Sequence, residues 1–395
     1  MQRLMFKAWN KVHEGNFFVL TYTATLLLSF HYYFIIYVSS SYLNQYISSR
    51  NVGIVFAAGA IVNIAMFISI SKYLKRFGNR KVMLFFITLE CVLLISLGFL
   101  HSISWIVPLF IIHEAINPML LLSLDIFLSD HSKNESIGAI RGIFMSIIGV
   151  SAVTAPIIAG SLLGENNFSN IFFVSAFFVI VLFILVLFNF KKYKDNSYQI
   201  IQPLTIIEKF IKSKPIREIF TSNLMLQLFY SWMIIYIPIY LFKYIGFSWS
   251  EIGLIISISI IPFVLFEFPL GELADKKIGE KEILLTGFAI MIVGLVCISL
   301  FHNQDILVWA FLLTFTRTGA SFVEVASETY FFKHINDTNK ELVNFWRTAN
   351  PLGFIMGTVL ASIALITLSY QYIFFILAGV LLLGFLYATR IKDTL

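Results

Sequence analysis

Charged residues are scarce in this chain. Asp, Glu, Lys and Arg make up 13% of its 395 residues, against about 25% in an ordinary soluble domain. Hydrophobic residues make up 58%, 42 residues are Phe, and the mean hydropathy is +0.86. A soluble fold of this length could not cover its surface with so few polar side chains. The composition therefore excludes a soluble globular protein.

Cysteine is also scarce, because Cys91 and Cys297 are the only two. Both fall in the middle of apolar stretches, which excludes a disulfide framework and a cysteine zinc site. The sequence also lacks a glycine-rich phosphate loop and a nucleophile with an adjacent base, which argues against an ATP-driven pump or a membrane enzyme. We therefore expect no cofactor, no metal and no enzymatic activity.

The chain is rich in long apolar runs separated by short polar hinges. A hydrocarbon core of roughly 30 Å needs about 20 apolar helical residues to cross it, and only helices or closed barrels satisfy their backbone there. The runs do not alternate between apolar and polar residues, so an outer-membrane barrel is excluded. The sequence predicts an all-α integral membrane protein with twelve transmembrane helices. The predicted spans are 17–38, 52–71, 82–100, 103–128, 137–163, 168–190, 222–242, 250–270, 283–301, 306–332, 343–367 and 372–389.

The positive charges predict the orientation. All but three of the 28 Lys and Arg residues lie on one side of the predicted membrane, the exceptions being Arg50, Lys243 and the mid-span Arg317. Short loops rich in Lys and Arg stay in the cytoplasm. An even number of spans then places both termini in the cytoplasm of a protein of the cell membrane. The net charge of +6 therefore indicates topology and contact with the lipid bilayer, and we expect no nucleic-acid partner.

The longest polar stretch divides the chain into two halves. The sequence predicts an N-terminal six-helix bundle over 1–190, a cytoplasmic connector over 191–221 with an amphipathic segment at 201–211, and a C-terminal six-helix bundle over 222–395. Similar residues recur at an offset near 200. These pairs are Gly78 with Gly279, Cys91 with Cys297, Asp125 with Glu328, and Arg141 with Arg347. Two pseudo-symmetric bundles are typical of transporters whose substrate site lies between the halves.

A motif follows the eighth predicted span. It reads Gly271-Glu-Leu-Ala-Asp275-Lys276-Lys-Ile-Gly279-Glu-Lys281. It resembles the G-x-L-A-D-R-x-G-R-R signature of the major facilitator superfamily, with one extra residue before the second glycine. The matching place after the second span keeps Arg76, Gly78 and Arg80 but has Lys75 in place of the acid. A loop whose charges only set the topology would explain the lysines, but not Gly271 together with Asp275.

The resemblance implies that this motif latches the cytoplasmic gate. It also implies two ion pairs near the gate, Asp125 with Arg141 and Glu328 with Arg347. In the fifth span, Gly142, Gly149, Pro156 and Gly160 resemble a degraded form of the Gly-Pro motif of exporters in this superfamily. A proline bend and small residues suit a gate, while ordinary helix packing is the alternative interpretation.

Ionisable residues within the spans indicate where function lies, because such groups are costly in a bilayer and usually face a cavity or each other. They are His31, Glu90, His113, Glu114, Glu267, Arg317 and Glu324. Arg317, Glu324 and Glu328 fall on one face of the tenth helix by their spacing. Glu114 and Asp125 occupy the corresponding heights in the fourth span.

In the superfamily the first, fourth, seventh and tenth helices line the cavity. The resemblance then implies that Glu114 and Arg317 face each other across it, with His31 and Gln227 as further cavity residues. We predict Glu324 as the titrating group. The alternatives are a static ion pair for Glu114 and Arg317 and a packing role for His31. Glu90 has no explanation from the sequence.

The functional hypothesis is a secondary transporter that moves a small organic solute by alternating access. The first choice is efflux of amphipathic compounds driven by a proton gradient, by a protein acting as a monomer. One alternative is a proton symporter that imports a nutrient or metabolite. Another is a non-transporting sensor on the same fold, although a large soluble domain would then be expected and the sequence has none.

Overall fold

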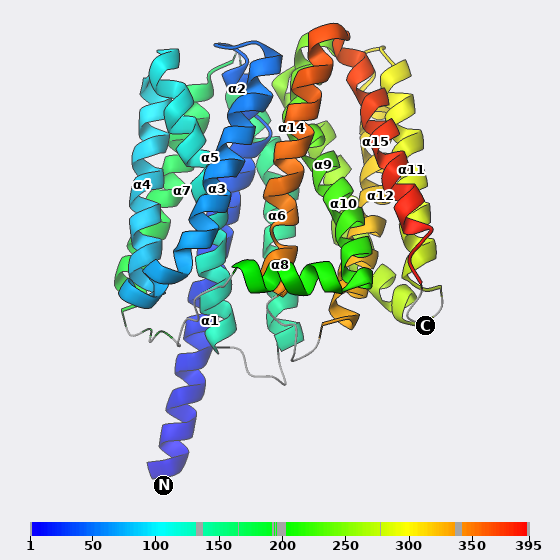
Figure 1. The fold of residues 1–395 in the computed structure, drawn as a ribbon. Helices are drawn as coiled ribbons and strands as arrows, with labels where there is room; N and C mark the ends of the chain where they lie inside the picture. Colours follow the sequence, from blue (N-terminus) through cyan, green and yellow to red (C-terminus); the bar gives the residue numbers. More distant parts are fainter. Residues whose placement is uncertain are drawn as a thin grey trace.

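The protein is described by a computed structural model as a bundle of helices (Figure 1). The structure describes residues 2–131, 137–164, 166–191, 193, 195, 203–276, 278–335 and 342–392, with side chains there except at 2–16, 131, 137–139, 203–206, 267–268, 271–276 and 344. Within this part of the chain there is no strand, and twelve helices are long and apolar enough to cross a membrane. The predicted fold class is confirmed.

Six long helices belong to each half. The first half contains α1 Gln2–Ile36, α3 Ser49–Phe77, α4 Asn79–Phe99, α5 Ile103–His131, α6 Ile137–Leu163 and α7 Phe168–Asn189. The second contains α9 Lys214–Tyr240, α10 Trp249–Lys276, α11 Glu280–Leu300, α12 Ile306–Lys333, α14 Ala349–Thr367 and α15 Ile373–Ala388. Short elements are α2 Ser39–Leu43, α8 Pro203–Lys212, η1 Leu241–Ile245, α13 Leu342–Trp346 and η2 Tyr370–Tyr372.

The two halves lie side by side and use equivalent helices to touch each other. The main contacts between them run along α6 with α10 and along α3 with α14. Within the halves, α4 packs on α7 as α11 packs on α15. Both termini and α8 lie at the same end of the molecule (Figure 1), which we call the basic end, and the other end is called the opposite end.

The internal repeat is visible in the backbone. Gly78 precedes α4 with φ +81° and ψ 156°, and Gly279 precedes α11 with φ +80° and ψ 163°. Residues with a side chain rarely adopt positive φ. The same reversal of chain direction therefore requires glycine at both places, which explains this pair of the predicted repeat.

The amphipathic segment of the connector is helical and crosses the basic end as α8 (Figure 1). Ile207 and Ile211 are exposed on it, as suits a helix that lies in a membrane interface. The Lys212 ammonium donates to the Glu208 carboxylate over 2.5 Å, and this contact lowers the pKa of Glu208.

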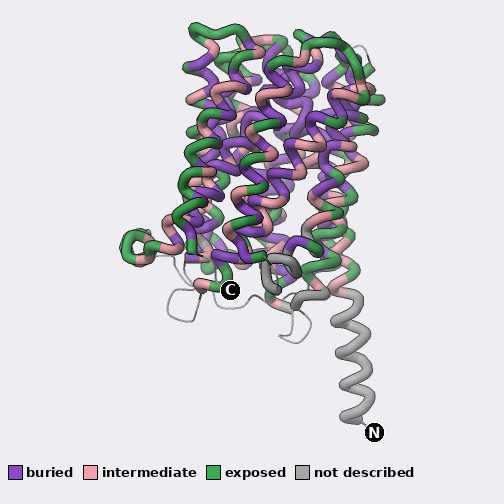
Figure 2. The backbone as a smooth tube through the Cα atoms, turned by 90° about the vertical axis from the view of Figure 1, so that its right-hand side faces the viewer, coloured by how far each residue is buried: buried purple, intermediate pink, exposed green. Residues whose placement is uncertain are grey.

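The outer surface of the bundle is apolar. Figure 2 shows exposed residues along its outer edges and buried residues through its centre. Exposed side chains on the spans include Phe85, Val92, Leu265, Leu307 and Phe311. A soluble protein rarely exposes so much contiguous apolar surface, so the burial pattern agrees with a protein surrounded by lipid.

Candidate transport site between the two bundles

The centre of the site is a charged and aromatic cluster on α12 and α9. Arg317 is only 6% exposed, and its guanidinium carbon lies 5.9 Å from the ring centroids of both Phe229 and Tyr230. The Tyr230 hydroxyl donates to Oε2 of Glu324 over 2.7 Å. Arg317 and Glu324 thus meet the same partner from one face of α12, in keeping with their spacing in the sequence.

Arg317 forms no ion pair with a carboxylate whose side chain the structure describes. The alternative of a static ion pair between Arg317 and Glu114 therefore does not hold in this conformation, while their placement on facing walls of a cavity stays a prediction. A buried cation without a counterion is costly. Cation–π contacts recover about 0.5–2 kcal/mol, which offsets the cost only in part. The arrangement leaves the guanidinium available to an anionic group.

Helix α1 brings the first half to this cluster. Tyr33 lies within electrostatic range of both Arg317 and Glu324, and Tyr32 lies within range of Glu114 on α5. Glu114 is partly exposed and packs close to α3, because a Cβ added at Gly59 would lie 2.9 Å from the Glu114 Cβ. Neighbouring tyrosines of α1 therefore lie near the ionisable groups of both halves.

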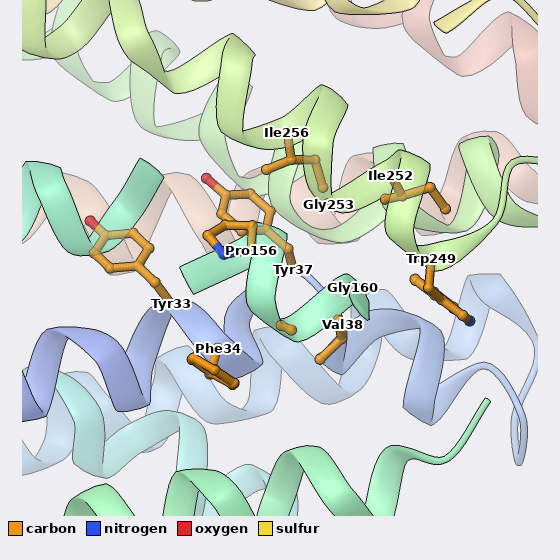
Figure 3. A pocket seen from close by; sticks show the side chains of 11 residues that line it. Tyr33, Phe34, Tyr37, Val38, Pro156, Gly160, Trp249, Ile252, Gly253 and Ile256 are labelled. Atoms are coloured by element: carbon orange, nitrogen blue, oxygen red, sulfur yellow. The ribbon is translucent and has the colours of Figure 1, made fainter. Parts of the chain in front are cut away.

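Beside this cluster, towards the opposite end, is a small pocket between α1, α6 and α10 (Figure 3). Tyr33 and Tyr37 of α1 form one wall, and Pro156 with Ile256 forms another. Because Tyr33 also belongs to the charged cluster, the pocket and the cluster are parts of one interface.

The opposite end is closed by contact between backbones. A Cβ added at Gly160 would lie 2.3 Å from the Trp249 carbonyl oxygen, and one added at Gly253 would lie 2.3 Å from that of Pro156. We call Pro156, Gly160, Trp249 and Gly253 the glycine clasp. Pro156, predicted at a gate, thus lies in the tightest contact between α6 and α10. Small residues are what such close helix contact requires.

Two hydrogen bonds reinforce this end. The Trp249 indole donates to Oδ1 of Asn166 over 2.6 Å, and the Ser362 hydroxyl donates to the Arg50 carbonyl oxygen over 2.8 Å. Both link one half to the other. The opposite end is therefore closed in this conformation.

The basic end is held by an ion pair between the halves. Arg347 donates to Oδ2 of Asp125 over 3.0 Å, and Arg141 donates to Oδ1 of the same carboxylate over 3.4 Å. The implied pair of Asp125 with Arg141 is present. The implied pair of Glu328 with Arg347 is not, because Arg347 reaches across the interface to the other half. Asp125 is thus a shared acceptor between the bundles.

The other residues of the gating motifs have local roles. Arg80 donates to the Leu187 carbonyl oxygen over 2.7 Å at the carboxyl end of α7, where helix carbonyls lack partners. Asp195 of the connector accepts from the Asn79 backbone N–H over 2.6 Å beside Gly78. The first-half motif has Lys75 at the position of the signature's acid, so Asp195 is an acid from outside the motif that contacts it. Arg76 lies over the Phe77 ring. The side chains of Asp275 and Lys276 and the surroundings of Gly271 lie outside the part of the chain whose side chains are described.

Of two further predicted cavity residues, one points away from the interface. His31 has no exposed surface and points into the core of the first half, where it contacts Ser175 and Asn117. The prediction placed His31 on the right helix but on the wrong face. Gln227 accepts from the Asn350 side chain over 2.8 Å and donates to Asn223 over 3.2 Å, so its amide joins α9 to α14, and its place in the cavity stays a prediction.

Glu90, which has no explanation from the sequence, contacts two histidines in the structure. Its Oε1 lies 2.6 Å from Nδ1 of His113 and 3.2 Å from Nε2 of His31. Glu90 and His113 lie near the middle of consecutive antiparallel helices, so their similar depths in the membrane were a usable signal.

With this geometry established, comparisons with known proteins identify the family. The model of the Major Facilitator Superfamily matches residues 21–248 and 219–394. The chain belongs to the Major Facilitator Superfamily of membrane transporters. No protein of curated function matches it significantly.

Several solved structures share the fold at low identity. A POT family transporter in complex with a thioalcohol-conjugated peptide has a TM-score of 0.76 and 14% identity, over 95% of this chain and 96% of that one. The nucleoside transporter NupG has a TM-score of 0.73 and 14% identity, over 95% and 100%. An inward-facing bacterial homologue of the lysosomal transporter Spinster has a TM-score of 0.72 and 12% identity, over 96% and 94%. At these identities the similarity shows the fold alone.

Proposed function

We propose that this protein is a proton-coupled secondary transporter that moves a small amphipathic organic solute by alternating access, with export as its direction and the basic end in the cytoplasm. The observation that supports this most is the cluster of Arg317, Tyr230 and Glu324. It combines a buried cation that makes no direct ion pair with a described side chain, aromatic faces and a carboxylate at the interface of the two bundles. These groups suit a solute with an apolar body and an ionised end.

The cluster also offers a way to couple protons to the solute. When Glu324 is charged, it partly neutralises the field of Arg317. When Glu324 gains a proton, Arg317 presents its full charge to a bound anion. Proton binding and solute binding then influence each other by the same free energy, as linkage requires.

Export is supported by the glycine clasp. Its Pro156 and Gly160 belong to the stretch that resembles the exporter motif, and this stretch forms a close backbone contact between the bundles. Import by symport is the second candidate. Import is favoured because protonation of Glu324 strengthens the binding of an anion at Arg317. A proton and an anion that strengthen each other's binding are carried across the membrane in the same direction. The solved relatives described as peptide and nucleoside transporters are compatible with an organic solute.

Transport in proteoliposomes under an imposed pH gradient tests the proposal. Two probes are needed, a fluorescent dipeptide with a free carboxylate and a lipophilic cationic dye. Solute movement against the proton flux supports export by exchange, and movement with it supports symport. Binding of a probe without gradient-driven movement of either would contradict a transporter and favour a sensor.

Variants connect this assay to the cluster. Glu324→Gln is expected to abolish accumulation driven by the pH gradient while solute exchange persists, because the titrating group is lost but the cavity is kept. Arg317→Ala is expected to impair both. Lys243→Ala is the matched control, since it removes an exposed cation at the opposite end. Unchanged pH-driven accumulation by Glu324→Gln would refute the role of Glu324.

A further inference from the structure

The group around Glu90 lies outside the transport site, in the core of the first half. His31 comes from α1, Glu90 from α4 and His113 from α5, and each is at most 2% exposed. The second half has no such group, because the repeat places Val296 opposite Glu90 and Thr316 opposite His113. That half packs α11 and α12 without buried charge at this place. The fold therefore does not require it.

Both ring nitrogens of His31 have polar neighbours. The Ser175 oxygen lies 2.6 Å from Nδ1 and 3.1 Å from the His31 carbonyl oxygen, and its one hydrogen serves one of these two contacts. Nε2 faces two acceptors, Oδ1 of Asn117 at 3.0 Å and Oε1 of Glu90 at 3.2 Å.

The orientation of Asn117 is fixed, since its Nδ2 donates to the His113 carbonyl oxygen over 3.1 Å. Its Oδ1 therefore faces His31, and Nε2 can only donate. Nδ1 of His113 lies 2.6 Å from the same carboxylate oxygen of Glu90. Two imidazoles therefore share one carboxylate, whose charge is balanced when one of the two rings carries a second proton. Oε2 of Glu90 has no hydrogen-bond partner in the described structure.

With Glu90 charged and one of the two imidazoles doubly protonated, the group has no net charge. Removing its proton would leave an unpaired carboxylate in hydrocarbon, which is strongly unfavourable unless the helices move or water enters. The titratable groups that face Glu90 are His31 from α1, His113 and Glu114 from α5, and Cys91 on its own helix. Helix α7 contributes the neutral Ser175.

Helix α5 connects this group to the transport site. Glu114 follows His113 directly, packs against Gly59 of α3 and lies within electrostatic range of Tyr32 of α1. Pro118 lies inside α5 and lacks the N–H that would bond the Glu114 carbonyl, so the helix is weakened where the two regions meet. A change in charge around Glu90 therefore acts on a segment that can bend.

We infer that His31, Glu90 and His113 form a proton-binding site in the core of the N-terminal bundle, and that its occupancy sets the arrangement of α1 and α5 at the transport site. The coupling to transport rests on the proposed function, whereas the second proton on one of the two imidazoles does not. The alternative is an ion pair that only holds the helices together.

The first experiment is nitrogen NMR of 15N-histidine in the purified full-length protein. Replacing the other five histidines by Gln leaves only His31 and His113 visible without touching the site. We expect one ring with both nitrogens protonated at neutral pH and one neutral ring. Two neutral rings at neutral pH would overturn the assignment, whether or not the protein transports anything.

The second experiment measures the pH profile of dipeptide and dye transport in proteoliposomes. Glu90→Gln and His31→Gln should each change the proton concentration for half-maximal transport at least tenfold. Glu280→Gln is the matched control, because Glu280 is also fully buried and pairs with Lys333 at 2.7 Å in the other half. It should reduce thermal stability without moving the profile.

An unchanged pH profile in both folded variants would overturn the coupling and favour a purely structural pair. If Glu90→Gln does not fold, the rescue variant Glu90→Asp serves, since it keeps the charge and should restore the profile of the wild type in part. If one ring has both nitrogens protonated but the protein moves neither probe under a gradient, the result would support the proton site and refute the proposed function.

Discussion

The glycine clasp gives the sharpest test of how the opposite end closes. In Gly253→Ala, the new methyl group would lie 2.3 Å from the Pro156 carbonyl oxygen, where ordinary contacts begin near 3.4 Å. The two backbones must therefore separate by about 1 Å. Overpacking of this kind costs typically 1–3 kcal/mol. At 1.4 kcal/mol for each factor of ten, the closed state loses about 5- to 140-fold in population relative to the open one.

Helix propensity cannot mimic this effect. Alanine favours a helix over glycine by roughly 0.5–1 kcal/mol, but it does so in every conformation of the transporter. Gly379→Ala on α15 is the matched control, because a Cβ there meets nothing within 4 Å. It should leave the balance of conformations unchanged.

The assay is maleimide labelling of Ile256→Cys, which lines the pocket beside the clasp and is 3% exposed. Cys91 and Cys297 are first replaced by alanine. Labelling from the opposite end should rise by the same 5- to 140-fold in Gly253→Ala. Equal labelling rates in Gly253→Ala and Gly379→Ala would refute the claim that this contact closes the opposite end.

Three further predictions concern the two ends. Arg347→Ala removes a half-exposed ion pair worth about 0.2–1 kcal/mol, so the population with an open basic end should rise up to about fivefold, measured by the distance between spin labels at Tyr73→Cys and Ile278→Cys. Asp125→Ala also removes the contact with Arg141 and should open this end at least as far; unchanged label distances in both variants would contradict the pair. Gly78→Ala should lower the melting temperature, because backbone strain at φ +81° costs of order 1–3 kcal/mol. The new methyl group would also collide with the Asp195 carboxylate, and adding Asp195→Ala should remove that collision but not the strain. A full recovery of the melting temperature in the double variant would contradict backbone strain. Lys243→Cys should be labelled from outside intact cells and Lys72→Cys should not; labelling of both would overturn the orientation.

The fold could be predicted because bilayer thickness imposes a length on each apolar run. The gate could be predicted only in part. The spacing in α12 identified Arg317 and Glu324 as neighbours, since a helix fixes which residues share a face. The partner of Arg347 was missed because Asp125 lies 222 residues away and in the other half. A family pattern within one half carries no information on contacts that depend on how the halves meet.

The faces of single residues were the hardest to predict, and His31 shows why. A histidine in the first helix can point to the interface or into its own bundle, and only the packing of α4, α5 and α7 decides. Glu90 determines which way His31 points, because a buried carboxylate needs hydrogen-bond donors and the two nearest imidazoles provide them. Glu90 and His31 were each unexplained or misplaced when considered alone, yet each accounts for the position of the other. In a membrane protein, buried ionisable residues are therefore best assigned as sets that leave no net charge in hydrocarbon, before any one of them is assigned to a cavity.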